Sequence, residues 1–220
     1  MNPVNRTMPS EIQDFYDRCT TGLANQDDTQ ACISFVKAEL PRLLLNKALF
    51  VGLMENIVNR QGYPDAKRPT VFDNEIPLFV HPDGLFSLRL YLWGPEEFTY
   101  PHDHNSWGVL GAVSPGFEVI NYRREDDGSR EGFARLSESE RFLLGAGETC
   151  HTLPFDDGIH ITGNPDDSAV LSLNFYGRVL PRGYLYRFNI HKQRAYRVYP
   201  PRRKKEILAG QALEFLRRGL

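Results

Sequence analysis

The sequence predicts a mostly β protein with helices at both ends, an antiparallel sandwich or barrel between a helical N-terminal extension and a helical C-terminal tail. Three observations favour this class. Apolar residues recur at helical spacing over roughly the first 60 residues, alternate with a period of two from about residue 70, and return to helical spacing in the tail. Glycine, proline and aspartate break the middle region into short runs, which is typical of antiparallel folds. We therefore expect a helical extension at 1–68, a β domain at 69–200 and a helical tail at 201–220.

The N-terminal extension contains three segments with helical patterns. Ser10 and Gln13 have the spacing of a capping box at the start of the first segment. The second, DDTQACISFVKAEL, begins with two aspartates that favour a helix N-terminus, and its apolar stripe includes Cys32, which we expect to be a buried thiol. Pro41 is expected to open a third helix, because proline is tolerated in a first turn.

Two segments of the middle region alternate most regularly. In LFSLRLYLWG, residues 85–94, Phe and Leu at the even positions alternate with more polar residues. In AVLSLNFYG, residues 169–177, leucine and phenylalanine alternate with serine, asparagine and tyrosine. Each pattern predicts a strand with two unlike faces. The tail KKEILAGQALEFLRRGL predicts a terminal helix.

The overall composition excludes several classes of protein. The chain has 220 residues, of which 41% are hydrophobic and 25% charged, and a net charge of −2, so nothing draws it as a whole to nucleic acid or an anionic membrane. The basic run at 202–205 is expected to be a solvated helix start. Three scattered cysteines indicate a reducing compartment. The sequence contains no membrane-spanning run and no secretory pattern at its start, so we expect a cytoplasmic location.

The stretch YPHDHNSWGVLG, residues 100–111, contains the first candidate metal ligands. His102 and His104 are separated by one residue, and on a strand this spacing places both imidazoles on the same face. Two converging imidazoles suit a transition metal. The alternative is a pair of surface histidines at the end of a strand. Asp103, between them, is expected to point away.

A metal site needs at least one more ligand. His160 is the first candidate, because the turn PFDDG precedes it in PFDDGIHITGN and could direct its ring into the mouth of a barrel. His151 is the reserve candidate. His81 and His191 are expected to be ordinary loop or strand-end residues. Asn164 is expected to tie the turn after His160.

The two segments PHDHNSWG and PFDDGIHITGN, in this order, resemble the two motifs of the cupins. Within that superfamily the stretch 85–177 is most similar to the cysteine dioxygenase-type thiol dioxygenases. The resemblance implies a double-stranded β-helix (jelly-roll) barrel and an iron(II) site of His102, His104 and His160, with zinc, nickel or manganese as other possible metals. Many cupins add a glutamate ligand, but this chain has Gly108 and Val109 at the matching positions, and Glu118 is too far along the strand.

In those dioxygenases a serine–histidine–tyrosine line on a late strand supports the iron. The matching residues are Ser172, Asn174 and Tyr176, so the resemblance implies a role for Tyr176 toward bound substrate or oxygen. Asparagine in place of the histidine cannot carry a proton as imidazole does. The alternative is a core tyrosine bonded to backbone. Val109 also replaces the cysteine that forms a crosslink to the tyrosine in animal enzymes.

The arginine that binds the substrate carboxylate in the family is absent from DNEIPLFVHPDG, residues 73–84. Other residues are therefore candidates for contacting substrate. Arg89 lies on the less apolar face of its strand, Arg123 and Arg124 follow Tyr122, and Trp107 could form a wall of the pocket. A surface position for each arginine, and a packing role for Trp107, are the alternatives.

These observations lead to one main hypothesis and two alternatives. The main hypothesis is a non-haem iron(II) enzyme that oxidises a small thiol to a sulfinate with O₂, with no nucleic-acid or membrane partner. The first alternative is a cupin enzyme that uses its metal for another oxygenation or an isomerisation. The second is a non-catalytic cupin that binds a small ligand, since barrels of this kind host many functions.

Overall fold

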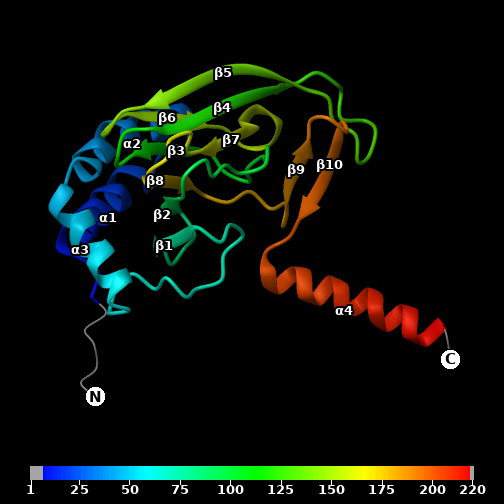
Figure 1. Cartoon of the computed structure of the whole chain (residues 1–220), viewed down its shortest axis with the longest axis horizontal. Helices are drawn as coiled ribbons and strands as arrows, with labels where there is room; N and C mark the ends of the chain where they lie inside the picture. The colour runs from blue at the N-terminus through cyan, green and yellow to red at the C-terminus, as the bar shows by residue number, and fades with distance from the viewer. Residues whose placement is uncertain (1–6, 219–220) are drawn as a thin grey trace.

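The computed structural model describes residues 7–218, in the order of three helices, ten strands and a final helix (Figure 1). A single turn of 3₁₀ helix, Phe155–Gly158, precedes β7. The elements are α1 (Ser10–Leu23), α2 (Thr29–Leu44), α3 (Lys47–Val58), β1 (Glu75–Val80), β2 (Phe86–Trp93), β3 (Gly108–Ala112), β4 (Phe117–Arg124), β5 (Leu136–Leu144), β6 (Thr149–Thr152), β7 (His160–Gly163), β8 (Val170–Gly177), β9 (Leu185–Asn189), β10 (Arg194–Val198) and α4 (Pro201–Arg218).

The strands form three antiparallel groups. Five strands make one sheet in the order β1-β2-β8-β3-β6, three make a second in the order β5-β4-β7, and β9 pairs with β10 as a hairpin. The extended segment before β3 joins the second sheet to this hairpin, because His102 pairs with His160 of β7 on one side and with Arg187 of β9 on the other. The protein is thus mostly β with helices at both ends, and within the described residues no sheet closes on itself.

The inner faces of the two larger sheets pack on each other. One buried cluster combines residues from both, with Trp93 and Leu110 from the five-stranded sheet and Phe117 and Val119 from the other. Trp93 lies 5.8 Å from Phe117, measured between ring centroids. This packing is that of a β-sandwich, in which the inner residues of both sheets interdigitate.

The N-terminal helices cover the outer face of the five-stranded sheet (Figure 1). Alternation along β2 and β8 explains how one sheet has two buried faces. Leu88 and Leu90 of β2, with Leu173 and Phe175 of β8, pack in one cluster with α1, α2 and α3. The residues between them point into the sandwich. This arrangement confirms the two unlike faces predicted for residues 85–94 and 169–177.

Two details of the N-terminal helices differ from the sequence predictions. Pro9 occupies the N-cap of α1 and no side chain caps it, because the Ser10 hydroxyl bonds Glu11 instead of the backbone; the predicted capping box is wrong. Pro41 lies inside α2 and does not open a helix, since α3 begins after Asn46, whose side chain accepts from the Leu49 amide. Cys32 is a buried free thiol, as predicted.

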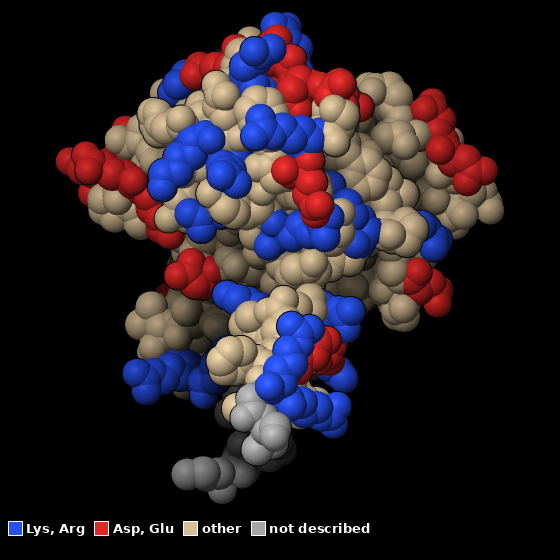
Figure 2. All heavy atoms as spheres, turned by 90° about the vertical axis from the view of Figure 1, so that its right-hand side faces the viewer, with Lys and Arg blue, Asp and Glu red and all other residues tan. Residues whose placement is uncertain are grey.

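The predicted C-terminal helix is present as α4, and it projects from the body with no buried residue (Figure 1). Figure 2 faces this end of the molecule, where blue lysine and arginine side chains gather on the helix while both signs mix over the body. α4 carries six basic and two acidic residues, so most of its surface potential is positive. Among the described helices, none combines the length and apolar character needed to cross a membrane.

We predict that Phe175→Ala will lower the free energy of unfolding by about 3–5 kcal/mol, because its ring packs on Phe15, Phe86 and Trp107 and its removal leaves a cavity. Phe215→Ala is the control: this ring is 78% exposed on α4, so its loss should change stability by less than about 0.5 kcal/mol. Urea unfolding followed by circular dichroism measures both. Equal effects of the two substitutions would contradict this packing.

Candidate metal centre

His102, His104 and His160 converge inside the sandwich. Their ring centroids lie 4.9 Å apart for His102 and His104, 4.8 Å for His102 and His160, and 4.7 Å for His104 and His160. One ring nitrogen from each lies within 4.8 Å of the others, and all three side chains are buried. Among the described residues this trio is the one cluster of histidine, cysteine or acidic side chains with metal-binding geometry, and it contains no carboxylate.

Backbone pairing brings the three rings together. His102 and His160 exchange two backbone hydrogen bonds of 3.0 Å, so their side chains stand side by side across neighbouring extended segments. The turn Phe155–Gly158 directs the chain into β7 just before His160, as predicted from PFDDG. The first pair differs from prediction in one respect. His102 forms an isolated bridge and His104 lies in the loop before β3, although the extended backbone still directs both rings inward.

The nitrogen positions fit a shared cation. His104 Nε2 and His160 Nε2 lie 2.9 Å apart. Two nitrogens at right angles around a metal at about 2.1 Å would be separated by about 3.0 Å. His102 Nδ1 lies 2.8 Å from the Tyr100 carbonyl, which can only accept, so we assign the proton to Nδ1 and leave the Nε2 lone pair free. The three residues therefore could hold a transition metal.

Burial keeps the three imidazoles neutral, which is the form that binds metal. Desolvation lowers the pKa of His102 to about 4, against a weaker opposing effect of the Tyr100 carbonyl. The pKa values of His104 and His160 also fall well below the usual range, first through burial and then through the neighbouring imidazoles. At neutral pH the site thus presents three lone pairs and no charge of its own.

Asp103 fixes the backbone between the first two ligands. It is fully buried and points away from the rings, as expected, and accepts two hydrogen bonds of 2.7 Å from the Arg182 guanidinium and a third from the Tyr186 amide. Arg182 also bonds Asn105 and lies against the aromatic ring of Phe155. A bidentate pair of this kind fixes the relative orientation of its two side chains in addition to attracting them. It therefore positions the His102–His104 segment.

Three buried side-chain polar atoms lack a partner among the described residues: His160 Nδ1, Asn174 Oδ1 and, farther from the histidines, Asn74 Nδ2. Leaving such atoms unpaired costs roughly 1–3 kcal/mol each. Unsatisfied buried groups are few in native proteins and are often associated with function. Their presence on a candidate ligand and on a residue of the predicted supporting strand distinguishes this region from an ordinary core.

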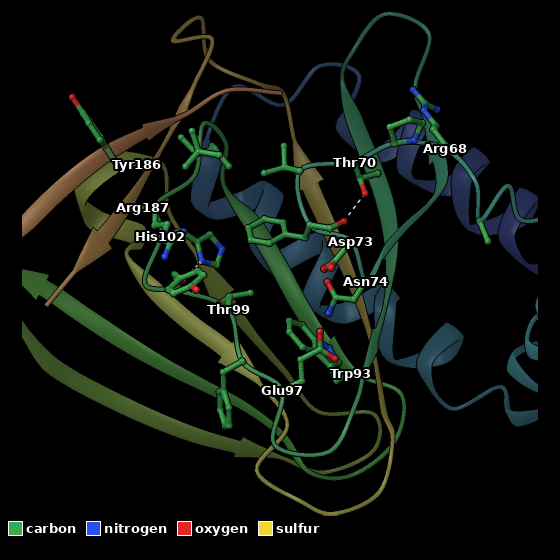
Figure 3. Close-up of a pocket in the computed structure, with 18 of the residues that line it drawn as sticks. Arg68, Thr70, Asp73, Asn74, Trp93, Glu97, Thr99, His102, Tyr186 and Arg187 are labelled. Carbon is green, nitrogen blue, oxygen red and sulfur yellow. Dashed lines mark hydrogen bonds between the residues drawn. The ribbon is translucent and has the colours of Figure 1, made fainter. Parts of the chain in front are cut away.

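A cavity of about 660 Å³ opens at His102, and we call it the His102 cavity (Figure 3). Glu97, Thr99 and His102 come from the segment after β2, while Asp73 and Asn74 lie across the space from them. The rest of the lining consists mainly of the 66–72 segment and the β9–β10 hairpin. The cavity therefore gives solvent or a ligand a route to one side of the candidate metal.

A second, smaller cavity of about 240 Å³ opens at His104, and we call it the His104 cavity. Tyr91 and Tyr176 line it, and the Tyr176 ring stacks on His104 with centroids 5.5 Å apart. A Cβ at Gly108 would lie 2.8 Å from this ring, so glycine is needed for the tyrosine to lie there. Burial raises the pKa values of both tyrosines, so both hydroxyls stay protonated and can donate.

The His104 cavity also contains an ion pair. Glu75 of β1 and Arg89 of β2 are bonded through a guanidinium N–H, and the Glu75 side chain is only 2% exposed against 30% for Arg89. Arg89 Nε bonds the Ser87 hydroxyl as well. Burial opposes the charge on Arg89, but Glu75 and the neighbouring tyrosines together outweigh it and raise the pKa of the guanidinium, so Arg89 remains charged.

The other residues of the predicted β8 line face the same interior. Ser172 Oγ accepts from the Trp93 indole at 3.0 Å, and Asn174 Nδ2 lies 3.4 Å from the Tyr176 hydroxyl. Asn174 therefore orients the Tyr176 side chain through a weak hydrogen bond, while Ser172 holds the buried Trp93 side chain. Asn164 bonds the backbone of Gly94 and Ser168, as expected for a residue that ties the turn.

Several candidates lie elsewhere. Arg123 is on the outside of β4, 72% exposed and paired with Glu125, and Arg124 pairs with Asp126 and Asp156. Trp107 packs against Phe175 and does not line either cavity, because it fits over Gly177. The remaining histidines also lie outside the cluster: His151 is exposed on β6, His81 is buried against Tyr16, and His191 is exposed beyond β9. Glu118 also lies outside it and accepts a hydrogen bond from Arg141.

Sequence reasoning did not find Glu75, Tyr91 and Arg182. Tyr91 shares the alternation of Arg89 and could have been included by the period-two argument. Glu75 belongs to no motif that marks it as part of a site, and Arg182 lies about 80 residues from its partner in a loop with no motif.

Comparison with known proteins gives distant structural matches. No protein-family model matches the chain, and no curated protein matches it in sequence. The solved structures that match include cupin proteins. A conserved cupin barrel domain protein from Salinispora arenicola is 17% identical over 52% of this chain and 85% of its own, with a TM-score of 0.37. The cupin domain of a transcriptional regulator from Enterobacter cloacae is 16% identical over 47% and 93%, with a TM-score of 0.32.

An oxalate oxidase in complex with the substrate analogue glycolate also matches, at 16% identity over 42% of each chain, with a TM-score of 0.33. Scores this far below 0.5 do not establish a common fold.

We predict that Arg182→Met will weaken zinc binding at least about tenfold and lower stability by roughly 3–5 kcal/mol, since it leaves the buried Asp103 carboxylate uncompensated. Arg197→Met is the matched control, because its pair with Glu131 is exposed to solvent and should contribute little to stability. Competitive zinc titration and thermal melting measure the two effects. If Arg182→Met bound zinc like the parent, the pair would not position the ligands.

Proposed function

We propose that this protein is a cupin-type metalloenzyme that uses iron(II) to add both atoms of O₂ to a small thiol, giving a sulfinate. The observation that carries the proposal is the set of three buried, neutral histidines without a carboxylate, bordered by the hydroxyl-lined His104 cavity. The overall reaction converts RSH and O₂ to RSO₂H, so it needs no other reductant. The enzyme is proposed to work in the cytoplasm on a small molecule, without nucleic acid.

The histidines fit iron(II), although zinc, nickel and manganese also accept imidazole. Bound iron would supply Lewis acidity and redox chemistry toward a thiolate and dioxygen, with three positions left open by a three-histidine set. The protein holds the three imidazoles neutral through burial and fixes the direction of two of them through Asp103 and Arg182. We propose residues 69–200 as the catalytic domain, with the N-terminal helices as its support.

The His104 cavity supplies groups that position a small substrate. The Tyr176 hydroxyl, held by Asn174 and kept protonated by burial, can donate a hydrogen bond to an atom bound next to His104. Arg89 keeps N–H groups beyond those used by Glu75 and Ser87, and these can bind the polar end of the same molecule. Val71, Phe72 and Leu185 form apolar parts of the wall and limit access of water.

A second candidate function is supported by the size of the His102 cavity. Its 660 Å³ exceeds what a small thiol fills and falls in the range of sites for larger ligands. A different oxygenation, on a larger substrate bound beside His102, would use this space. In that case the same metal ligands serve another reaction.

The test is oxygen uptake by anaerobically iron-loaded protein with cysteine, 3-mercaptopropionate and cysteamine. We expect uptake with at least one thiol, with one sulfinate formed for each O₂ consumed. His160→Ala should abolish both iron retention and uptake, while the control His151→Ala, a substitution of an exposed histidine on β6, should change neither. No uptake with any thiol by protein that retains iron would exclude the thiol dioxygenase and favour the second candidate.

We predict that Tyr176→Phe will lower kcat for the accepted thiol by about tenfold to a hundredfold and leave iron content unchanged, because it removes a hydrogen-bond donor next to His104 and keeps the stacked ring. Steady-state oxygen consumption with iron quantified in the same sample measures this. Tyr122→Phe, on β4 and outside both cavities, is the control. An unchanged kcat in Tyr176→Phe would assign the tyrosine to packing.

A further inference from the structure

The buried pair of Glu75 and Arg89 gives the His104 cavity a charge balance that affects which substrates it can accept. Glu75 is the negative partner and lines the cavity together with Arg89. The other polar residues there are uncharged: Ser87, Tyr91, His104, Asn105, Ser106, Tyr176 and Tyr184. The protein groups of this cavity therefore sum to no net charge, although an arginine is exposed to it.

Arg89 faces a ligand with its charge already compensated. One guanidinium N–H is bonded to Glu75 and Nε to Ser87, while the side chain is 30% exposed. A carboxylate placed on the remaining N–H groups would bring a second negative charge beside the buried carboxylate of Glu75. A neutral acceptor, such as an amide or hydroxyl oxygen, would use the same N–H groups without that repulsion.

We propose that Glu75 is a specificity residue of this cavity: it prevents Arg89 from selecting carboxylates and directs the cavity to thiols whose polar end carries no negative charge. The inference rests on the proposed function for the thiol, and it names the class of substrate. Arg89 acts as a hydrogen-bond donor, and Glu75 acts through it without contacting the reacting atoms. Amides and alcohols of small thiols fit this class.

The test compares two thiols of nearly equal shape, 3-mercaptopropionate and 3-mercaptopropionamide, which differ in one negative charge. Their binding to zinc-loaded protein is measured by calorimetry at pH 7, so no oxygen chemistry enters the result. Glu75→Gln should tighten binding of the acid at least about tenfold and change that of the amide less than about threefold, because the charge of Arg89 is then uncompensated. Glu138→Gln, an exposed residue paired with Arg141, is the control.

A double variant keeps the test decisive if Glu75→Gln does not fold. Glu75→Gln with Arg89→Gln removes both charges and leaves no unpaired ion, so the ratio of acid to amide affinity should stay within about threefold of the parent. A larger loss of the acid would show that Arg89 attracts carboxylates despite Glu75 and would overturn the inference. Failure of the parent to bind either thiol would also overturn it. The proposed oxidation is judged separately, by oxygen uptake.

Discussion

The interaction between Asp103 and Arg182 is the constraint on which the site depends. A buried carboxylate between two histidine ligands needs compensation, and Arg182 supplies it from the loop before β9 with two hydrogen bonds of 2.7 Å. The pair ties the segment before β3 to the hairpin. Because successive side chains of an extended segment point in opposite directions, holding Asp103 outward directs His102 and His104 inward. A single ion pair thereby sets the geometry of two of the three candidate ligands.

Burial affects the charge of the ionisable groups around the three histidines in different ways. It removes the charge from the three imidazoles and keeps the two tyrosines protonated, yet Arg89 keeps its charge because Glu75 lies beside it. The region is therefore rich in hydrogen-bonding atoms and poor in net charge. A divalent cation would be the dominant charge there, and the surrounding dipoles would orient toward it.

Local patterns in the sequence predicted much of this structure. The period-two runs predicted β2 and β8 with their two faces, because alternation depends on neighbouring residues. The spacing of His102 and His104 predicted one pair of the histidine cluster, and the turn before His160, together with the resemblance to cupins, predicted its third member. Arg182 and Glu75 were not predicted, because their roles come from ion pairs with residues far away in the sequence. Arg123 was placed near the site by its neighbours in sequence, but the outward face of β4 directs it to solvent.

The wall of Val71, Phe72 and Leu185 is shared by both cavities, with the Phe72 ring 4.9 Å from that of His102. The candidate metal position is therefore bordered by two cavities that have this wall in common. A bulky compound in the larger cavity would press on the smaller one through this shared wall without displacing a small molecule bound there. Inhibition from that side would then be of the non-competitive kind, with Phe72 as the contact between the two occupants.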